Sequence, residues 1–384
     1  MTTPRHIGLN AVFLRPAMGG MEIYVRGLLP QLLAMRPDLR LTVFANARTR
    51  ELLASEPWTD RVRLVTHPLV GRRYTSAISE LTLLGRLADR AGVHVLHSLA
   101  MTAPLRSRAV SIVTVPDLIW LFHPDSLSRL TTSLWRVIVP PLARRADRIL
   151  TFSAASRDDI VRELRVPDRR VDVVPLGPGI EPSANPTPEA ELRERWSLGG
   201  GPIVLALSSK VRHKNLLRLV EAMVPLRATQ PTAVLVLPGS PTTYERTLRE
   251  AADRLGVAGN VRFLGWVNGR DLEGLYRASA CFVYPSLKEG FGLPILEAMR
   301  RGVPVACSRT SALPEVAGQA ARYFDPRDPA DIAAALNEIL AEQRLRENLI
   351  AAGYERQRRF TWQATAEGTL AAYERAWRSR SGKQ

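Results

Sequence analysis

Short apolar segments alternate with amphipathic segments along the whole chain, and this alternation limits the fold more than any other feature. The short segments have the length of buried strands, and the longer ones have helical spacing. The first series of predicted strands comprises residues 6–14, 41–46, 62–67, 93–98, 109–115, 148–153 and 171–176. The second series comprises residues 202–209, 233–238, 261–266, 281–285, 303–307 and 321–324. Such alternation is typical of parallel sheets covered by helices on both faces, so an α/β fold is predicted.

A polar, proline-rich stretch at residues 177–191 separates the two series. With 384 residues the chain exceeds what one hydrophobic core usually supports, so two doubly wound domains are expected. We predict one domain over residues 1–178 and a second over residues 179–360. Ligands of such sheets bind at the carboxyl ends of the strands, so the two domains are expected to face each other across one cleft.

A last helix is predicted from about residue 361 onward. Leu370, Tyr373 and Trp377 follow a spacing of three and four residues, which indicates that one face of this helix is buried.

Composition favours a cytoplasmic protein. No apolar run approaches the ~18 residues that a membrane-spanning helix needs. The N-terminus lacks the cleavage pattern of a signal peptide. Cys281 and Cys307 each lie in a short apolar run, where they are expected to be reduced core thiols.

The formal net charge is +16, with a larger excess of arginine in the N-terminal half. Such a charge suits peripheral contact with an anionic membrane or attraction of a phosphorylated acceptor; scattered, solvated arginines are the alternative reading. The arginines are dispersed, and the chain has no RNP, zinc-finger or helix-turn-helix pattern. Nucleic acid is therefore not expected as a partner.

The segment EGFGLPILE, residues 289–297, carries the most specific chemistry. Its glycines let backbone N–H groups approach an anion, and a helix N-terminus favours phosphate. Glu297 lies roughly two helical turns beyond Glu289, where a carboxylate accepts hydrogen bonds from vicinal hydroxyls. A phosphate cradle flanked by two such acceptors suits a nucleotide sugar. The competing interpretation is a surface helix with two solvated glutamates.

Residues 284–318, YPSLKEGFGLPILEAMRRGVPVACSRTSALPEVAG, resemble the donor-site signature of glycosyltransferase family 4. Further matches lie near the N-terminus, at 146–177, 212–222 and 261–267, and at the C-terminus. The chain is most similar to bacterial mannosyl- and rhamnosyltransferase-like members. The resemblance implies the GT-B fold: two Rossmann-like domains, an N-terminal acceptor domain and a C-terminal donor domain, with the last helix, about 361–384, packed back on the first. It also implies retaining transfer of a hexose or deoxyhexose from a nucleotide-diphosphate sugar to an acceptor hydroxyl of a glycan, a lipid-linked molecule or a secondary metabolite.

The resemblance assigns the donor residues one by one. Lys214 matches the family's phosphate lysine, Glu289 is expected to face the hydroxyls of the transferred sugar, and Glu297 is expected to face the ribose diol. The family often carries an arginine where this chain has Ser208 and Ser209, so Lys210 or Arg212 is left to supply a second cation. The other predicted donor contacts are Gly19, Gly20, Ser209, Gly239, Val267, Phe291, Gly292 and Leu293.

A departing diphosphate can be neutralised by cationic side chains or by a metal. The sequence has no D-x-D pair, and its six histidines form no ligand cluster beyond His94 and His97. No metal or other cofactor is therefore predicted, and Lys214 is assigned to catalysis with Glu289 and Asp117.

Position 116 departs from the family. Many relatives carry His-Asp where this chain has Pro116 and Asp117. Proline has neither a titratable side chain nor an N–H group, so it can act as neither acid nor base. Three accounts remain: the leaving phosphate takes the acceptor's proton, Asp117 or His97 replaces the histidine, or the protein binds sugar nucleotides without turnover. Another GT-B nucleotide-sugar enzyme, such as an epimerase, is a further alternative.

The acceptor residues are sought in two loop-rich stretches, 67–80 and 117–135, which carry arginines beside aromatic side chains. Such side chains could receive an aglycone or a lipid phosphate, or could be core and rim residues. The predicted acceptor residues are Arg72, His97, Trp120 and His123. The nucleotide base, the acceptor and the oligomeric state are not predicted.

Overall fold

The computed structural model describes residues 3–16, 18–66 and 76–381, and the chain divides into two compact units. Unit 1 comprises Met1–Leu121, Ser128–Gly177 and Phe360–Gln384, and unit 2 comprises Phe122–Leu127 and Pro178–Arg359. Unit 1 ends at Gly177, one residue before the predicted end of the first domain at residue 178. The chain re-enters unit 1 at Phe360, one residue before the predicted position 361. The segment Phe122–Leu127 departs from that expectation, because it packs with unit 2 although it lies within the first predicted domain.

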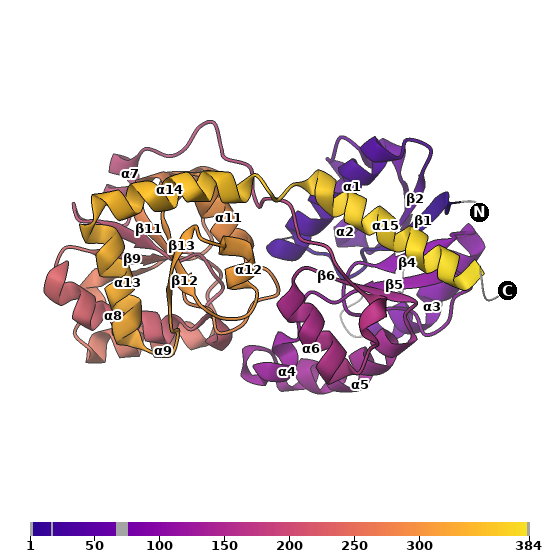
Figure 1. The fold of residues 1–384 in the computed structure, drawn as a ribbon, viewed down its shortest axis with the longest axis horizontal. Helices are drawn as coiled ribbons and strands as arrows, with labels where there is room; N and C mark the ends of the chain where they lie inside the picture. Colours follow the sequence, from indigo (N-terminus) through magenta and orange to yellow (C-terminus); the bar gives the residue numbers. More distant parts are fainter. Residues whose placement is uncertain (1–2, 17, 67–75, 382–384) are drawn as a thin grey trace. The chain divides into compact units, whose positions relative to one another are not determined.

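Unit 1 is built on a parallel sheet in the order β3-β2-β1-β4-β5-β6-β7 (Figure 1). Its strands are β1 (His6–Asn10), β2 (Arg40–Ala45), β3 (Arg63–Thr66), β4 (Val95–Ser98), β5 (Val110–Thr114), β6 (Arg148–Thr151) and β7 (Val171–Val173). Its helices are α1 (Gly20–Met35), α2 (Ala47–Ala54), α3 (Ser76–Ala91), α5 (Arg129–Arg145), α6 (Ala154–Leu164) and α15 (Trp362–Ser381). The short α4 (Ile119–Phe122) leads from this unit into the segment that packs with unit 2.

Unit 2 repeats this plan with the strand order β10-β9-β8-β11-β12-β13, also parallel throughout. Its strands are β8 (Ile203–Leu205), β9 (Val234–Leu237), β10 (Val261–Phe263), β11 (Ser279–Tyr284), β12 (Val305–Ser308) and β13 (Ala321–Phe324). Its helices are α7 (Glu189–Arg195), α8 (Leu216–Thr229), α9 (Tyr244–Arg254), α10 (Gly269–Ala278), α11 (Leu293–Arg300), α12 (Leu313–Ala317), α13 (Pro329–Ala341) and α14 (Gln343–Gln357).

Every strand of both sheets overlaps its predicted range, so the predicted pair of doubly wound domains is confirmed. The central strands are apolar on both faces because helices cover both sides; all five residues of β1 are buried. Cys281 and Cys307 are buried free thiols on neighbouring strands, and burial raises the pKa of Cys281 to about 12. In each sheet the strand order reverses beside the first strand, between β1 and β4 and between β8 and β11. Ligands of open α/β sheets bind at the carboxyl ends of strands at such switch points.

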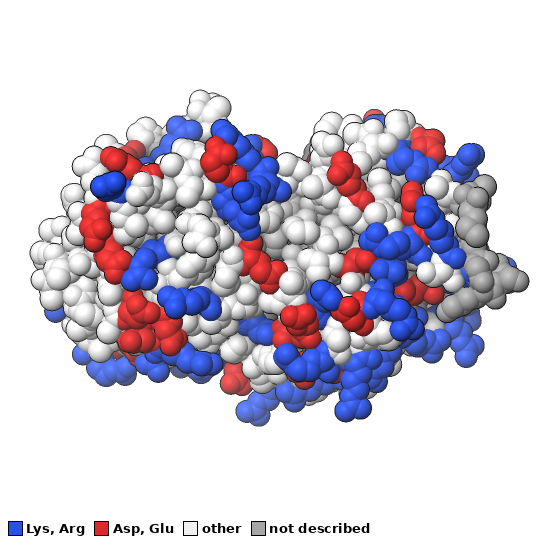
Figure 2. Space-filling view, viewed as in Figure 1, with Lys and Arg blue, Asp and Glu red and all other residues white. Residues whose placement is uncertain are grey.

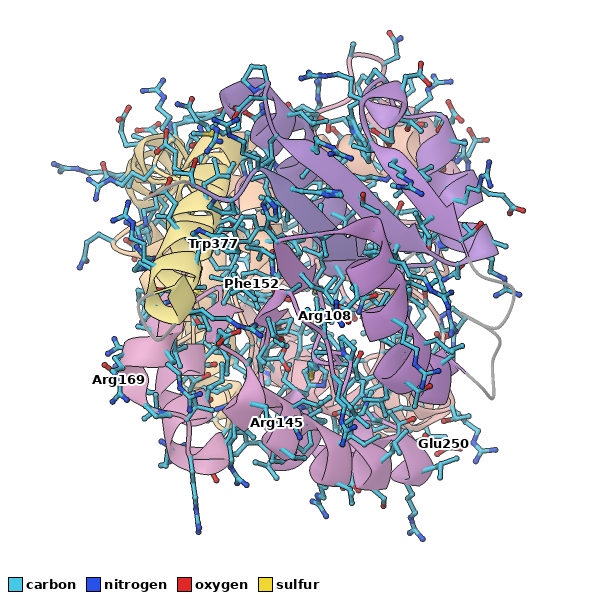
Figure 3. All side chains as sticks on the ribbon, turned by 90° about the vertical axis from the view of Figure 1, so that its right-hand side faces the viewer. Arg108, Arg145, Phe152, Arg169, Glu250 and Trp377 are labelled. Atoms are coloured by element: carbon cyan, nitrogen blue, oxygen red, sulfur yellow. The ribbon has the colours of Figure 1, made fainter. Side chains whose placement is uncertain are left out.

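The C-terminal helix α15 packs on unit 1, along α1 and against β5 and β6 (Figure 1). Thr365 of α15 donates a hydrogen bond to the carbonyl of Pro175 over 2.8 Å. Trp377, labelled in Figure 3, lies against His94, with ring centres 5.3 Å apart and ring planes tilted by 36°. Tyr373 is buried, as the spacing predicted, whereas Leu370 and Trp377 are half-buried.

Trp362, at the start of α15, lies against two glycines of unit 1. A Cβ at Gly27 of α1 would lie 2.2 Å from the indole, and a Cβ at Gly177 would lie 2.5 Å from it. We therefore expect Gly27→Ala to lower the free energy of unfolding by about 1–3 kcal/mol, the usual cost of overpacking a core. Thermal unfolding measures this loss. Gly200→Ala, whose Cβ meets open space, is the control, and equal melting temperatures for the two variants would contradict the close fit.

Basic side chains are unevenly spread on the visible face. Figure 2 shows Lys and Arg gathered along the lower edge of unit 1, where Figure 1 draws α5 and α6. Among the described residues, none of the helices combines the length and the apolar content that a bilayer crossing requires.

Candidate functional site

The segment 289–297 follows β11 and forms the entry to α11, as the sequence predicted. Gly292 precedes the helix with a φ of 121°, a conformation that favours glycine, and no side-chain cap occupies this helix end among the described residues. Phe291 and Leu293 are buried on either side of it. Pro294 has no N–H group, and the N–H of Ile295 already donates to the Gly292 carbonyl over 3.0 Å. The backbone donors that this helix start can offer an anion are therefore those of the turn around Gly292 and Leu293.

Lys214 and Glu289 meet at this entry. Lys214 lies in a 3₁₀ turn, Arg212–Lys214, that follows β8, and its Nζ donates to the Glu289 carboxylate over 2.6 Å and to the Tyr284 hydroxyl over 2.9 Å. Glu289 is held from the other side by Ser311, whose Oγ donates to its carbonyl over 2.8 Å. Two residues that the sequence assigned separately to phosphate and to sugar thus form one ion pair at the carboxyl ends of β8 and β11.

Both members of this pair are charged at neutral pH. Burial works against the charged forms, but the attraction between them outweighs it, so the pKa of Lys214 is raised and the pKa of Glu289 is lowered. The cation is therefore available to an incoming anion only if that anion shares Lys214 with Glu289 or displaces the carboxylate.

A segment from the first half of the sequence lies beside this pair. The N–H of His213 donates to Ser126 Oγ over 3.3 Å, and the His123 and His213 rings have centres 6.3 Å apart. Lys288 Nζ lies 3.9 Å from the centre of the Phe122 ring. His123, predicted to contact the acceptor, thus packs with unit 2 next to Lys214 and Glu289. His213 Nδ1 is buried without a hydrogen-bond partner among the described residues.

Glu297 is also buried, but its carboxylate is already engaged. One oxygen accepts a hydrogen bond from the N–H of Ile180 over 3.0 Å, and the other accepts one from the Tyr276 hydroxyl over 3.0 Å. Burial raises the pKa of Glu297, and these two bonds oppose that rise. A Cβ at Gly179 would lie 1.9 Å from the same carboxylate, so glycine is required there. The predicted ribose ligand therefore also anchors the segment that enters unit 2.

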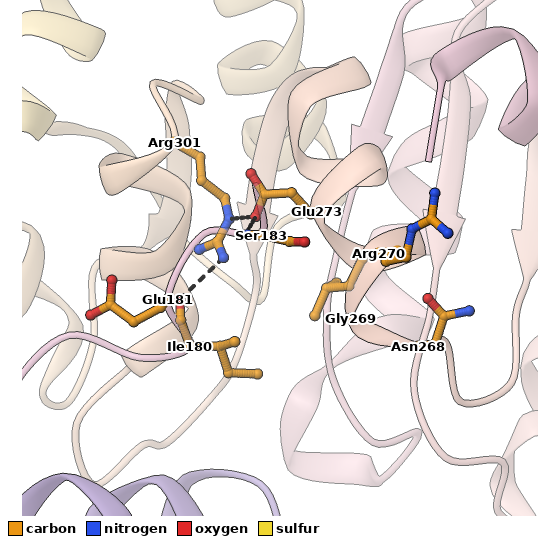
Figure 4. A pocket seen from close by; sticks show the side chains of 9 residues that line it. Ile180, Glu181, Ser183, Asn268, Gly269, Arg270, Glu273 and Arg301 are labelled. Carbon is orange, nitrogen blue, oxygen red and sulfur yellow. Dashed lines mark hydrogen bonds and ion pairs between the residues drawn. The ribbon is translucent and has the colours of Figure 1, made fainter. Parts of the chain in front are cut away.

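A pocket of about 360 Å³ adjoins this anchor (Figure 4). Arg301 forms one wall, donating to Glu273 over 2.8 Å and to the Ile180 carbonyl over 3.1 Å. The other lining residues are Glu181, Ser183, Asn268, Gly269, Arg270 and Leu272. Asn268 caps the start of α10 and follows Val267, one of the predicted donor contacts.

Lys210 and Arg212, the two candidates for a second cation, differ in whether they are exposed. Lys210 is fully buried, and its Nζ donates to the carbonyls of Gly239 and Leu264, each over 2.8 Å. It ties the ends of β9 and β10 together and cannot reach a phosphate, so that option is wrong. Arg212 is exposed, with its guanidinium 4.8 Å from the Tyr244 ring centre, and remains the candidate.

Two further predicted donor residues lie nearby. Ser209 is exposed, whereas Gly239 is buried against the neighbouring turn. A Cβ at Gly239 would lie 2.1 Å from the Ser208 carbonyl oxygen, so the close approach of the loops after β8 and β9 depends on this glycine.

In unit 1, Gly19 and Gly20 form the start of α1. Gly19 has a φ of 59°, no side-chain cap is described at this helix end, and a Cβ at Gly19 would meet open space. Both glycines are exposed. The two glycines thus form an open helix N-terminus, and their contact with the donor stays a prediction.

Asp117 opens α4. Its Oδ1 accepts a hydrogen bond from the N–H of Ile119 over 2.9 Å, which orders the turn after Pro116. The structure gives Asp117 this local role; its assignment to catalysis remains untested.

Two predicted acceptor residues are not accessible, and both assignments need correction. His97 is fully buried, with Nδ1 2.7 Å from the Tyr373 hydroxyl and Nε2 2.8 Å from Thr114 Oγ1. Burial lowers the pKa of His97 to about 3, so it stays neutral and joins β4 to α15. Trp120 is buried against Trp135, with ring centres 6.4 Å apart. Arg72 lies outside the described residues.

Glu80 is a titratable residue that the sequence reasoning missed. It projects from α3 to the switch point between β1 and β4, where its Oε1 accepts hydrogen bonds from Asn10 Nδ2 over 2.5 Å and from Thr102 Oγ1 over 2.7 Å. Burial raises the pKa of Glu80 to about 7, although both bonds oppose this. An acidic residue in an amphipathic helix gives no sequence signal that it will be buried.

Glu80 makes stability depend on pH. Its pKa is higher in the folded chain than in the unfolded chain, so stability is lost as pH rises from about 4.5 to about 7. Glu80→Gln keeps an acceptor oxygen but cannot ionise. We expect this variant to be more stable than the wild type at pH 8, by on the order of 2 kcal/mol, and equally stable at pH 4.5. Denaturant unfolding at both values tests this, and an equal loss of stability at both would show that the carboxyl group itself is needed, whether ionised or not.

Among the described residues, no three His, Cys, Asp or Glu side chains gather in a way that could hold a metal ion.

Comparison with known proteins identifies the family of the chain. Residues 18–179 match the family described as Glycosyltransferase Family 4, and residues 189–356 match the family described as Glycosyl transferases group 1. The chain is 33% identical over 269 residues to O-antigen chain mannosyltransferase B of Escherichia coli, a match that covers 69% of this chain and 68% of that protein. The chain therefore belongs to the family 4 glycosyltransferases, and the predicted resemblance is confirmed.

One further relative and one solved structure match more of the chain. A GDP-mannose-dependent alpha-(1-6)-phosphatidylinositol monomannoside mannosyltransferase of Mycolicibacterium smegmatis is 27% identical over 86% of this chain and 87% of its own length. The crystal structure of Anabaena HepE in complex with UDP and glucose matches 96% of this chain and 98% of its own, with a TM-score of 0.73 and 18% identity, which supports the GT-B fold. Some other curated relatives are longer: the chain matches 56% of one and 29% of another.

Proposed function

We propose that this glycosyltransferase is a retaining, metal-independent enzyme that transfers a hexose from a nucleotide-diphosphate sugar to an acceptor hydroxyl. The observation that carries the proposal is the meeting of Lys214, Glu289 and the uncapped start of α11 at the carboxyl ends of β8 and β11. These groups supply a cation, a hydroxyl acceptor and backbone donors within one short segment. A nucleotide-diphosphate sugar needs all three.

The reaction breaks the bond between the sugar's anomeric carbon and the diphosphate oxygen, and the bonding electrons leave with the diphosphate. Lys214 and the α11 N-terminus would stabilise the negative charge that develops on this oxygen. Arg212 is exposed on the same turn and could add a second cation. Glu289 would orient the sugar through its hydroxyls, and Glu297 would accept from the ribose diol while holding Ile180.

A bond then forms between the acceptor oxygen and the anomeric carbon on the face that the diphosphate leaves. The acceptor's proton passes to the departing phosphate oxygen, so no protein base is required. This route fits the chain, because Pro116 cannot titrate and His97 is buried in its neutral form.

Mannose is the first sugar to test, because the relatives named above are mannosyltransferases and one of them is GDP-mannose-dependent. A thermal-shift screen with UDP, GDP, dTDP and ADP measures the preferred nucleotide, since a ligand that binds the native state raises its melting temperature. Transfer assays with the matching sugar nucleotides follow. Product analysis distinguishes transfer, with retained anomeric configuration, from epimerisation.

Pro116 favours one second candidate, a protein that binds nucleotide sugars without turnover. Wild-type protein that binds a sugar nucleotide tightly, yet neither transfers nor hydrolyses the sugar, would support this candidate. Appearance of turnover in Pro116→His would decide for it. Turnover unaffected by EDTA in the wild type supports the metal-independent enzyme, whereas loss on chelation with recovery on added Mg²⁺ or Mn²⁺ would refute that part of the proposal.

A further inference from the structure

The outward face of α5 in unit 1 carries an apolar stripe formed by Leu130, Leu134 and Val137. These side chains are exposed by 80%, 41% and 72% respectively. Their spacing of four and three residues keeps them on one side of the helix. The opposite side packs into the unit through Val139, Leu142 and other buried residues. Three large apolar side chains side by side on a helix surface indicate an interaction site rather than scattered exposure.

Positive charge surrounds the stripe. Residues 126–146 include four arginines and no acidic residue. The arginines are Arg129, Arg136, Arg144 and Arg145, and all four are exposed. Figure 2 shows basic side chains along this edge, and Figure 3 shows Arg145 on the lower side of the unit.

The acidic residues of the neighbouring α6 do not neutralise the positive charge of these arginines. Arg162 pairs with Asp159 and with Glu163 over 2.8 and 2.7 Å, and Arg157 pairs with Asp168. Asp158 is exposed there, and so are Arg165 and Arg169. The surface formed by α5 and its surroundings is therefore net positive.

We propose that the apolar stripe of α5 docks this glycosyltransferase on the surface of an anionic lipid bilayer. The helix lies in the plane of the interface, with Leu130, Leu134 and Val137 among the acyl chains and the arginines at the headgroup phosphates. A second copy of the chain is a poorer occupant, because a symmetric contact through this face would set the same arginines against each other. The inference rests on α5 alone and does not depend on the proposed function.

Vesicle flotation tests the proposal with the full chain. Wild-type protein should bind vesicles of phosphatidylcholine with phosphatidylglycerol, bind pure phosphatidylcholine much less, and dissociate as salt rises. The double variant Leu130→Ser with Val137→Ser should bind anionic vesicles at least ~10-fold more weakly, because it removes the apolar anchor. Both positions are exposed, so the variant should fold, and circular dichroism checks this. Arg129→Ser with Arg136→Ser should weaken binding mainly at low salt.

Matched controls come from unit 2. Val224→Ser in α8 replaces another exposed aliphatic residue, 38% exposed, and Arg246→Ser in α9 replaces an exposed arginine. Neither should change vesicle binding. The proposal fails if wild-type protein ignores anionic vesicles, or if the double variant binds them as well as the wild type. It also fails if ultracentrifugation finds a dimer that the double variant abolishes while vesicle binding is absent.

Discussion

Replacement of Lys214 by alanine is expected to lower kcat/KM for sugar transfer at least ~100-fold, which corresponds to about 2.7 kcal/mol of lost transition-state stabilisation. Lys214 is the cation assigned to the diphosphate, and it meets the α11 entry through Glu289. Removal of the ammonium leaves the Glu289 carboxylate buried without its partner, which repels the incoming phosphate and adds to the loss. Transfer assays with the nucleotide sugar selected by thermal shift measure this effect.

Arg212→Ala is the matched control for Lys214. Arg212 lies in the same turn but is exposed, and the Tyr244 ring rather than a carboxylate is its neighbour. We expect a loss below ~10-fold, because a solvated cation contributes less than a partly buried one. Similar losses in both variants would contradict the special role of the Lys214–Glu289 pair. Circular dichroism must confirm that Lys214→Ala folds.

Glu289→Ala and Glu297→Ala are expected to separate catalysis from nucleotide binding. Loss of a hydrogen bond to a charged group costs about 1.5–3 kcal/mol, so each change should exceed ~10-fold. Glu289→Ala should lower turnover by that factor while diphosphate affinity stays equal or increases, because Lys214 is released from its ion pair. Glu297→Ala should weaken nucleotide affinity instead. Calorimetric titration with the nucleotide and steady-state kinetics together distinguish the two.

Glu297 needs a stability control. Its carboxylate accepts bonds from Ile180 and Tyr276, so truncation also disturbs the segment that enters unit 2. Tyr276→Phe removes one of these bonds and leaves the carboxylate in place. If Tyr276→Phe weakens the nucleotide as much as Glu297→Ala, the effect is structural and the ribose assignment is wrong. Equal, small effects of Glu289→Ala and Glu297→Ala would contradict both assignments.

The position of the donor segment, residues 289–297, was predictable because the residues that determine it are close together in the sequence. A glycine turn after an apolar strand, followed by a helix, fixes where residues 289–297 lie and where their N–H groups point. The family resemblance then paired Lys214 with the same site, and the structure brings its Nζ to Glu289. The segment Phe122–Leu127 had no such signal, since its neighbours in unit 2 lie far away in the chain.

The sequence by itself determined the two doubly wound sheets, because hydrophobic periodicity and turn residues act over a few positions and recur along the chain. Only the tertiary structure decided which polar side chains are exposed and can contact a ligand. Lys210 and Arg212 are two residues apart, yet one is buried between carbonyls and the other is exposed. His97 was predicted to contact the acceptor, but α15 covers it, and Glu80 of α3 is buried where it accepts a hydrogen bond from Asn10 at the end of β1. Burial and pKa depend on contacts between distant segments, so they are set when the sheets and helices pack together.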